Sequence, residues 1–229
     1  IINILTILAN TIQPTIGDYF TEKNYRRNYE ILRQITFAFF CISSVVAVGL
    51  FSLITPFVRD IWLGPSYELG WGTAVLCIVV LMVRIMGLPL NMVMGVTGLF
   101  EKEKNVGASS AILNLVVSLA LVKPYGMTGV LLGTLVSYLL QICYRYIIFF
   151  RDFLQMREEA LRYARDLGEY LAVMAAEVAL MQKVVPIVYG NGGMVLFCIC
   201  FLLCILVPLA LDAVFFGRGW RLQSIVRMV

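Results

Sequence analysis

The sequence contains no histidine, and only 14% of its residues are charged. Zinc sites are closed sets of cysteine and histidine ligands, so this chain would have to build one largely from cysteine. Its six cysteines include three in one apolar run, Cys198, Cys200 and Cys204, but Cys198 does not share a helix face with the other two. We therefore expect neither a metal site nor a bound cofactor.

The scarcity of charge also argues against a water-soluble domain, because 61% of the residues are hydrophobic. In lipid, every backbone polar group must be hydrogen-bonded within the protein, which leaves α-helices and closed barrels. The apolar runs here are long, whereas barrel strands alternate over about ten residues. The sequence thus predicts an all-α, polytopic bundle of transmembrane helices.

Seven apolar segments have about the length that crosses a bilayer. They cover about 1–17, 35–57, 72–98, 106–122, 127–149, 169–188 and 194–216. The fourth segment is short, and the sixth contains Glu177 and Gln182. Because the chain starts at Ile1 inside an apolar run, we expect a truncated first span in a fragment of a longer protein. No cleavable signal peptide is visible.

Lysine and arginine alternate in number from one connection to the next. Thirteen fall in connections 18–34, 99–105, 150–168 and 217–229, and three in the connections between them, with Lys183 counted for the last. Cytoplasmic connections carry the excess of basic residues, so the alternation supports all seven spans and predicts a cytoplasmic C-terminus. Because the basic residues are split among separate loops, we expect no nucleic-acid partner.

The connection 151–168 has the pattern of an amphipathic helix. Most of its basic residues fall away from the positions of its apolar residues. The apolar residues recur near helical spacing and are Phe153, Leu154, Leu161, Ala164 and Leu171. We predict a cytoplasmic interfacial helix here, with docking of a partner as the alternative. The chain would then consist of part of a transmembrane bundle in 1–150, this linker, and an additional helix pair with a cytoplasmic tail in 169–229.

Residues 101–140 carry a distinctive motif. Asn114 and Ser118 share one helix face, the turn KPYG follows, and Gly129 and Gly133 form a small-xxx-small face that lets helix backbones approach closely. The pattern N-x3-S-x2-L…YG-x2-G-x3-GT resembles the polysaccharide flippases of the multidrug/oligosaccharidyl-lipid/polysaccharide exporter superfamily, which translocate O-antigen and teichoic-acid repeat units. The segments IQPTIGDYFTEKN (12–24) and ITPFVRDIWLGPSYELGW (54–71) also resemble parts of the second half of such proteins.

This resemblance covers roughly residues 1–150. It implies two bundles that face each other in a V, with most of the second bundle and two terminal helices in this chain. It also implies flipping of a polyprenyl-diphosphate-linked oligosaccharide across the bacterial inner membrane by alternating access, for the biosynthesis of a surface polysaccharide such as the O-antigen of lipopolysaccharide. The other partners would be membrane lipid and a coupling ion, either a proton or sodium.

Arg84 is the most unusual residue of the predicted spans. It lies about twelve residues from either end of its span, roughly 18 Å of helix, which is too far for its side chain to reach an interface. One interpretation is a structural pair with Glu177 or with a backbone carbonyl freed near Pro89. The other is a substrate-binding cation in a wet cavity, because a guanidinium forms two parallel hydrogen bonds with phosphate oxygens.

Two asparagines are further candidates for substrate binding. Asn91 lies two helical turns after Arg84 and shares its face. Asn114 is a second candidate, although Asn114 and Gln141 are also typical of hydrogen bonds between membrane helices.

Two acidic residues lie in the last spans. Glu177, near the middle of its span, would either titrate during ion coupling or neutralise an arginine. Asp212 is expected at the cytoplasmic interface, close to Arg218.

Two other classes of protein stay open. An integral-membrane glycosyltransferase or polymerase would keep catalytic acids or arginines in a large outer loop, but the longest predicted outer loop, 58–71, has only Asp60 and Glu68 as acids. A multidrug or cation exporter of the same superfamily would favour intramembrane carboxylates over arginine. We therefore expect a transporter and not an enzyme.

Overall fold

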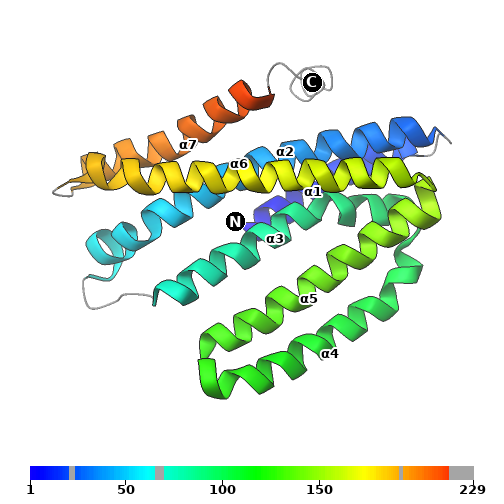
Figure 1. Cartoon of the computed structure of the whole chain (residues 1–229), viewed down its shortest axis with the longest axis horizontal. Coiled ribbons are helices and arrows are strands. Elements are labelled where there is room, and N and C mark those ends of the chain that lie inside the picture. The colour runs from blue at the N-terminus through cyan, green and yellow to red at the C-terminus, as the bar shows by residue number, and fades with distance from the viewer. Residues whose placement is uncertain (21–23, 65–69, 191–192, 217–229) are drawn as a thin grey trace. The chain divides into compact units, whose positions relative to one another are not determined.

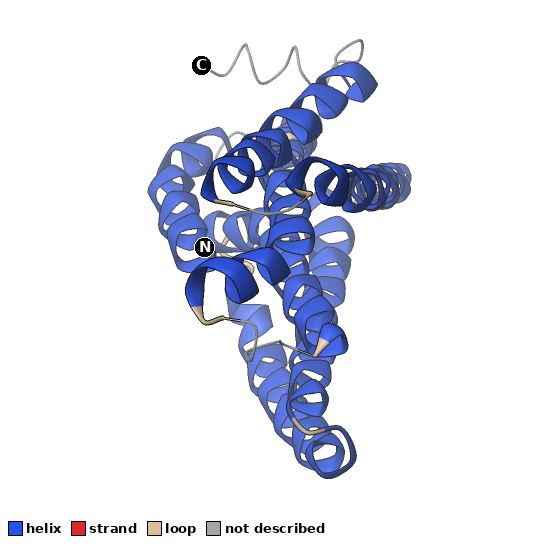
Figure 2. Ribbon diagram, turned by 90° about the vertical axis from the view of Figure 1, so that its left-hand side faces the viewer, coloured by secondary structure: helices blue, strands red, loops and turns tan. Residues whose placement is uncertain are grey.

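The computed structural model describes residues 1–20, 24–64, 70–190 and 193–216. These residues form helices joined by short turns and contain no strand (Figure 2). The predicted all-α architecture is confirmed. Three predictions fall outside the described residues, namely the cytoplasmic tail 217–229, its Arg218, and Glu68 of the predicted outer loop.

The described part of the chain contains seven α-helices and two π-helical segments. They are α1 (Ile2–Phe20), α2 (Tyr25–Pro56), η1 (Phe57–Trp62), α3 (Trp71–Val96), α4 (Phe100–Tyr125), α5 (Met127–Ile148), η2 (Phe149–Leu154), α6 (Arg157–Tyr189) and α7 (Met194–Phe216) (Figure 1). Six of them, α2 to α7, are long and apolar enough to cross a membrane. The protein is therefore a multi-pass membrane protein. The truncated span predicted at the N-terminus, α1, is not among the six.

These helices form two compact units, each discontinuous in sequence. Unit 1 comprises Ile1–Phe39 and Val79–Arg165, and unit 2 comprises Phe40–Ile78 and Asp166–Val229. The helices α2, α3 and α6 contribute residues to both units. Residues 40–78 belong to the same unit as the C-terminal helices, although they are far from them in sequence. The predicted division into consecutive segments, with boundaries at 150 and 168, did not anticipate this association.

The core of unit 1 is aromatic and surrounds η2. Phe149 and Phe150 are buried there, and the ring of Phe149 stacks on that of Phe153 with 5.4 Å between centroids. Tyr163, near the start of α6, lies 5.4 Å from the ring of Phe150. Its hydroxyl is 3.0 Å from the Thr36 hydroxyl of α2, so a buried hydrogen bond joins these two helices within the unit.

The predicted interfacial linker, residues 151–168, does not form a helix of its own. The helical path breaks at Gln155, which adopts the left-handed conformation with φ of 55°, and residues 157–189 then continue as one helix of 33 residues. The first part of α6 is rich in Ala, Leu, Glu and Arg, which favour helix, and it meets no proline before Pro186. No separate linker helix therefore precedes the sixth span. At about 50 Å, α6 is longer than the hydrocarbon core of roughly 30 Å and extends beyond it.

α4 and α5 form an antiparallel hairpin with its helices side by side (Figure 1). Gly126 alone separates them, with φ of 56° and ψ of −132°, a conformation that side chains other than glycine strongly disfavour. A Cβ added to Gly133 would lie 2.9 Å from the Asn114 carbonyl oxygen, and one added to Gly129 would lie 2.9 Å from Leu121 Cβ. The close helix crossing predicted from the glycine spacing is confirmed.

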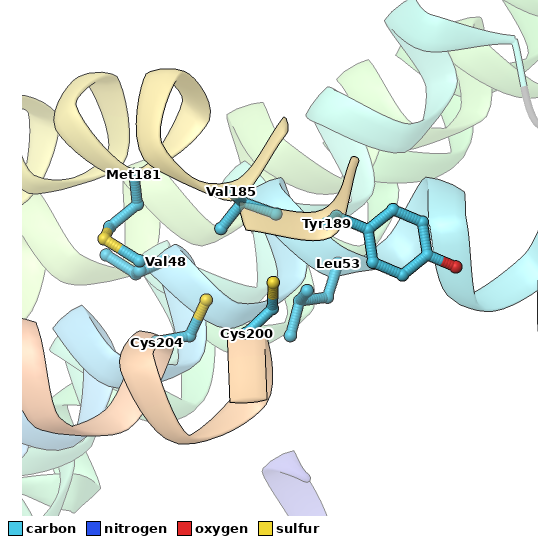
Figure 3. Close-up of a cluster of buried hydrophobic side chains, with 7 residues drawn as sticks. All are labelled: Val48, Leu53, Met181, Val185, Tyr189, Cys200 and Cys204. Atoms are coloured by element: carbon cyan, nitrogen blue, oxygen red, sulfur yellow. The ribbon is translucent and has the colours of Figure 1, made fainter. Parts of the chain in front are cut away.

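The core of unit 2 is an apolar cluster built by α2, α6 and α7 (Figure 3). Its buried members are Val48, Leu53, Met181, Val185, Tyr189, Cys200 and Cys204. Cys200 and Cys204 lie on one face of α7 and have free thiols, whereas Cys198 is exposed. In this cluster the two buried cysteines act as small apolar side chains.

Labelling of the α4–α5 hairpin tests the predicted sidedness. α4 has 26 residues and is about 39 Å long, so its two ends should emerge on opposite sides of the membrane. In a cysteine-free background, a cysteine at the exposed Tyr125 should react with a membrane-impermeant maleimide in intact cells. A cysteine at the exposed Glu101 should react only after permeabilisation, because the connection 99–105 is basic. Labelling with the reverse pattern would invert the topology, and labelling of both in sealed cells would show that α4 does not span.

Candidate functional site

A cavity of about 200 Å³ lies inside unit 1, between α1, α3 and α5. Its polar wall consists of Thr6 of α1, Arg84 and Asn91 of α3, and Tyr138, Gln141 and Arg145 of α5. On both α3 and α5 the wall residues recur every three or four positions over two turns, so each helix presents one face to the cavity. Among the described residues, no carboxylate belongs to this wall.

A glycine brings the two main walls together. Gly87 lies one turn after Arg84 on α3, and a Cβ added to it would lie 3.0 Å from Cδ1 of Ile142 on α5. The helices therefore touch at Gly87 and Ile142, and polar residues lie along each helix on both sides of this contact. A larger residue at position 87 would push the polar faces apart.

Arg84 lies in the middle of α3, thirteen residues after Trp71 and twelve before Val96. Its guanidinium carbon is 5.1 Å from the centroid of the Tyr138 ring, which is a cation–π contact. Within the described part of the chain, Arg84 has neither an ion pair nor a side-chain hydrogen bond. Tyr138 covers one face of the guanidinium, and the N–H groups at its edge remain able to bind a ligand.

The second arginine of the wall is neutralised. Arg145 donates from Nε to Oε1 of Glu103 on α4 at 2.6 Å, and its Nη2 is 3.5 Å from Oε1 of Gln141. Gln141 in turn donates from Nε2 to the Ser110 hydroxyl of α4 at 2.6 Å. The role of Gln141 in bonding helices to each other is confirmed. This network holds α4 against α5 and leaves Arg84 as the uncompensated cation of the cavity wall.

Only two of the four predicted site residues meet in this cavity. Arg84 and Asn91 both line it, Asn91 with an exposed side chain. Asn114 lies at the α4–α5 crossing, where its Oδ1 accepts a hydrogen bond from the Ser118 hydroxyl at 3.1 Å. Glu177 belongs to unit 2, where Ser44 of α2 donates a hydrogen bond to it. Glu177, which the sequence suggested as a charge partner for Arg84, is therefore hydrogen-bonded within unit 2.

Tyr138 and Arg145 were missed as site residues. They lie seven residues apart on α5, with Gln141 and Ile142 between them, which repeats the spacing of Arg84, Leu88 and Asn91 on α3. This periodicity marks a helix face that polar groups share. It does not reveal which neighbouring helix meets that face, because the contact joins segments about fifty residues apart.

The arrangement suits an anion. A single uncompensated guanidinium, a phenol ring and two amides line a small cavity, and the described residues of its wall contribute no negative charge. In the part of the chain that the structure describes, no three side chains of His, Cys, Asp or Glu gather as metal ligands. No protein-family model, curated protein or solved structure matches the chain.

Proposed function

We propose that the protein flips a polyprenyl-diphosphate-linked oligosaccharide across the bacterial inner membrane by alternating access, and that Arg84 binds the diphosphate. The observation that supports this proposal is the mid-span Arg84, which faces a cavity and has no carboxylate partner in the described residues. Charged residues within a bilayer are energetically expensive and tend to mark the paths of substrates and ions. A diphosphate would provide the negative charge that the cavity wall lacks.

The size of the cavity limits which part of the substrate it could hold. Pockets for drug-sized ligands measure roughly 300–1,000 Å³, whereas this cavity is about 200 Å³. It suits the diphosphate and leaves the oligosaccharide outside it. Arg84 would bind two phosphate oxygens with its planar fork, and Asn91, two turns further along α3, would offer an amide to the adjoining phosphate or sugar.

Loss of the protein should block transport but not synthesis of the substrate. A bacterial strain that lacks the gene should lose surface polysaccharide and accumulate the lipid-linked oligosaccharide in the cytoplasmic leaflet, where an externally added lectin cannot reach it in spheroplasts. A plasmid-borne copy of the gene should reverse both effects.

The same strain distinguishes the two alternatives. If the lipid-linked oligosaccharide is no longer made, the protein is a glycosyltransferase or polymerase and not a flippase. If surface polysaccharide persists and sensitivity to cationic drugs rises, the protein is a drug or cation exporter.

A further inference from the structure

Two acidic side chains are buried in unit 2, on helices that are apolar enough to span the membrane. Glu177 of α6 is 1% exposed and Asp212 of α7 is 2% exposed. Asp212 lies one turn before the end of α7, and its position at the interface stays a prediction. Their carboxyl groups lie against each other. From α2, the Ser44 hydroxyl donates a hydrogen bond to Glu177, and the Cys41 thiol faces Asp212.

Neither carboxyl group has a cationic partner in the described part of the chain. Three of the four oxygens, Oε1 of Glu177 and both of Asp212, are also buried there, and the donor that faces Asp212 is the weak S–H group of Cys41. Among the residues that the structure describes, the charged and titratable groups that act on the pair are the two carboxyls themselves and the thiol of Cys41. An ionised carboxylate only accepts hydrogen bonds, so the contact between the two becomes a hydrogen bond when one of them holds a proton.

Layers of apolar side chains close off the pair in both directions along the helices. On one side, Phe40, Tyr170 and Phe216 pack together, with ring centroids 4.5 to 5.7 Å apart. Phe40 lies one turn before Ser44, and Phe216 lies one turn after Asp212.

On the other side lies the apolar cluster of Figure 3, which begins at Val48, one turn after Ser44, and at Met181, one turn after Glu177. The two carboxyl groups thus occupy a polar layer between two apolar layers. In such surroundings the two groups cannot be ionised at the same time. The second carboxylate would lack hydration and would be repelled by the charge of the first.

We infer that Glu177 and Asp212 form one proton-binding site, and that the proton held there is the coupling ion of transport. Proton binding follows from the geometry of the pair, whereas the coupling rests on the proposed transport function. Uptake transfers one proton from water to a carboxylate oxygen and lowers the negative charge of the pair by one. Release to water requires one of the two apolar layers to open, so exchange with either side of the membrane depends on the conformation of α2, α6 and α7.

Infrared spectroscopy of the purified protein in lipid nanodiscs tests proton binding without any substrate. At pH 7 the wild-type protein should show the C=O stretching band of a protonated carboxylic acid, shifted in D2O. The double variant Glu177→Gln with Asp212→Asn should lack this band. Asp60→Asn is the matched control in the same unit and should leave the band unchanged, because Asp60 is paired with Arg59 at 2.7 Å and remains ionised.

Three results would overturn the inference: no band in the wild-type protein, a band that survives in the double variant, or a band that disappears when sodium is added at constant pH. The last would make the pair a sodium site. If the double variant does not fold, dicyclohexylcarbodiimide, which attacks protonated carboxyls in apolar surroundings, serves as the second measurement. Mass spectrometry should locate its adduct at Glu177 or Asp212 of the wild-type protein, and an adduct confined to other residues would contradict the site.

Coupling is tested separately in proteoliposomes with an imposed pH gradient. The gradient should accelerate flipping of the lipid-linked oligosaccharide by the wild-type protein at least tenfold and leave the rate of the double variant unchanged. Equal acceleration of both proteins would show that the coupling proton binds elsewhere. A wild-type protein that shows the infrared band but flips nothing would refute the proposed function and leave the proton site in place.

Discussion

Substitution of Arg84 by alanine should abolish export of the surface polysaccharide while the protein stays in the membrane at near-normal abundance. The guanidinium would form two charge-assisted hydrogen bonds with the diphosphate, each worth about 1.5–3 kcal/mol. Their loss corresponds to at least a ~100-fold decrease in transport, since about 1.4 kcal/mol is a factor of ten. Abundance should be preserved because no carboxylate in the described part of the chain relies on Arg84 for neutralisation. Immunoblots of membranes alongside quantification of exported polysaccharide give both readings.

Arg84→Lys and Tyr138→Phe are the matched variants. Lysine keeps the charge but loses the planar fork, so export should recover only in part. Tyr138→Phe keeps the ring that lies 5.1 Å from the guanidinium and should export almost as the wild type does. Arg84→Lys thus tests whether export needs the planar fork in addition to the charge. Tyr138→Phe tests whether it needs the hydroxyl in addition to the ring.

A purely structural role for Arg84 predicts a different outcome. Removal of one partner of a buried ion pair destabilises a protein by about 3–5 kcal/mol, so the abundance of Arg84→Ala would fall. Neutralising the predicted partner as well, in Arg84→Ala with Glu177→Gln, would then restore it. Full export by Arg84→Ala would exclude both roles.

Substitution of Gly133 by leucine should prevent the protein from accumulating. A Cβ at this position would already lie 2.9 Å from the Asn114 carbonyl oxygen and 2.9 Å from the Ser118 backbone nitrogen, and leucine adds three further carbons. Overpacking of a core typically costs about 1–3 kcal/mol, and here the obstacle is helix backbone, which cannot rotate away. We expect at least a several-fold loss of abundance, measured by immunoblot and by size-exclusion chromatography in detergent.

Gly107→Leu is the control for Gly133→Leu. Gly107 lies in the same hairpin, on α4, and no atom is within 4 Å of a Cβ built on it. This variant should accumulate normally. If Gly133→Leu also accumulates but changes which glycan is exported, the glycine face lines the substrate path and does not mediate helix packing.

Local features of the sequence predicted the α4–α5 hairpin well. Its turn and its close crossing depend on Gly126, Gly129 and Gly133, which lie within two helical turns of one another and act within this one hairpin. The bend at Gln155 could not be predicted in this way, because glutamine rarely adopts a left-handed conformation and neither glycine nor proline marks the position. The predicted linker therefore runs across this break, whereas α6 begins at Arg157.

The candidate site depends on long-range packing and could be predicted only in part. The chemistry of Arg84 stood out because an arginine in mid-span is rare. That Tyr138 would cover it follows from the pairing of α3 with α5, which the periodicity of neither helix determines. Likewise, the contact of Asp212 with Glu177 depends on how α7 packs in unit 2, which the place of Asp212 near the end of an apolar run does not reveal.

The one-residue turn at Gly126 also bears on how the chain enters the membrane during synthesis. The hydroxyl oxygen of Ser118 lies 3.1 Å from Oδ1 of Asn114 and 3.4 Å from the backbone carbonyl oxygen of Val130 across the hairpin, so its one proton has two possible acceptors. Alone in lipid, α4 would expose these polar groups to hydrocarbon, and α5 supplies both the covering surface and one of the acceptors. The translocon is therefore expected to release α4 only after α5 has emerged from the ribosome, so that the two helices partition into the bilayer together as a preformed pair.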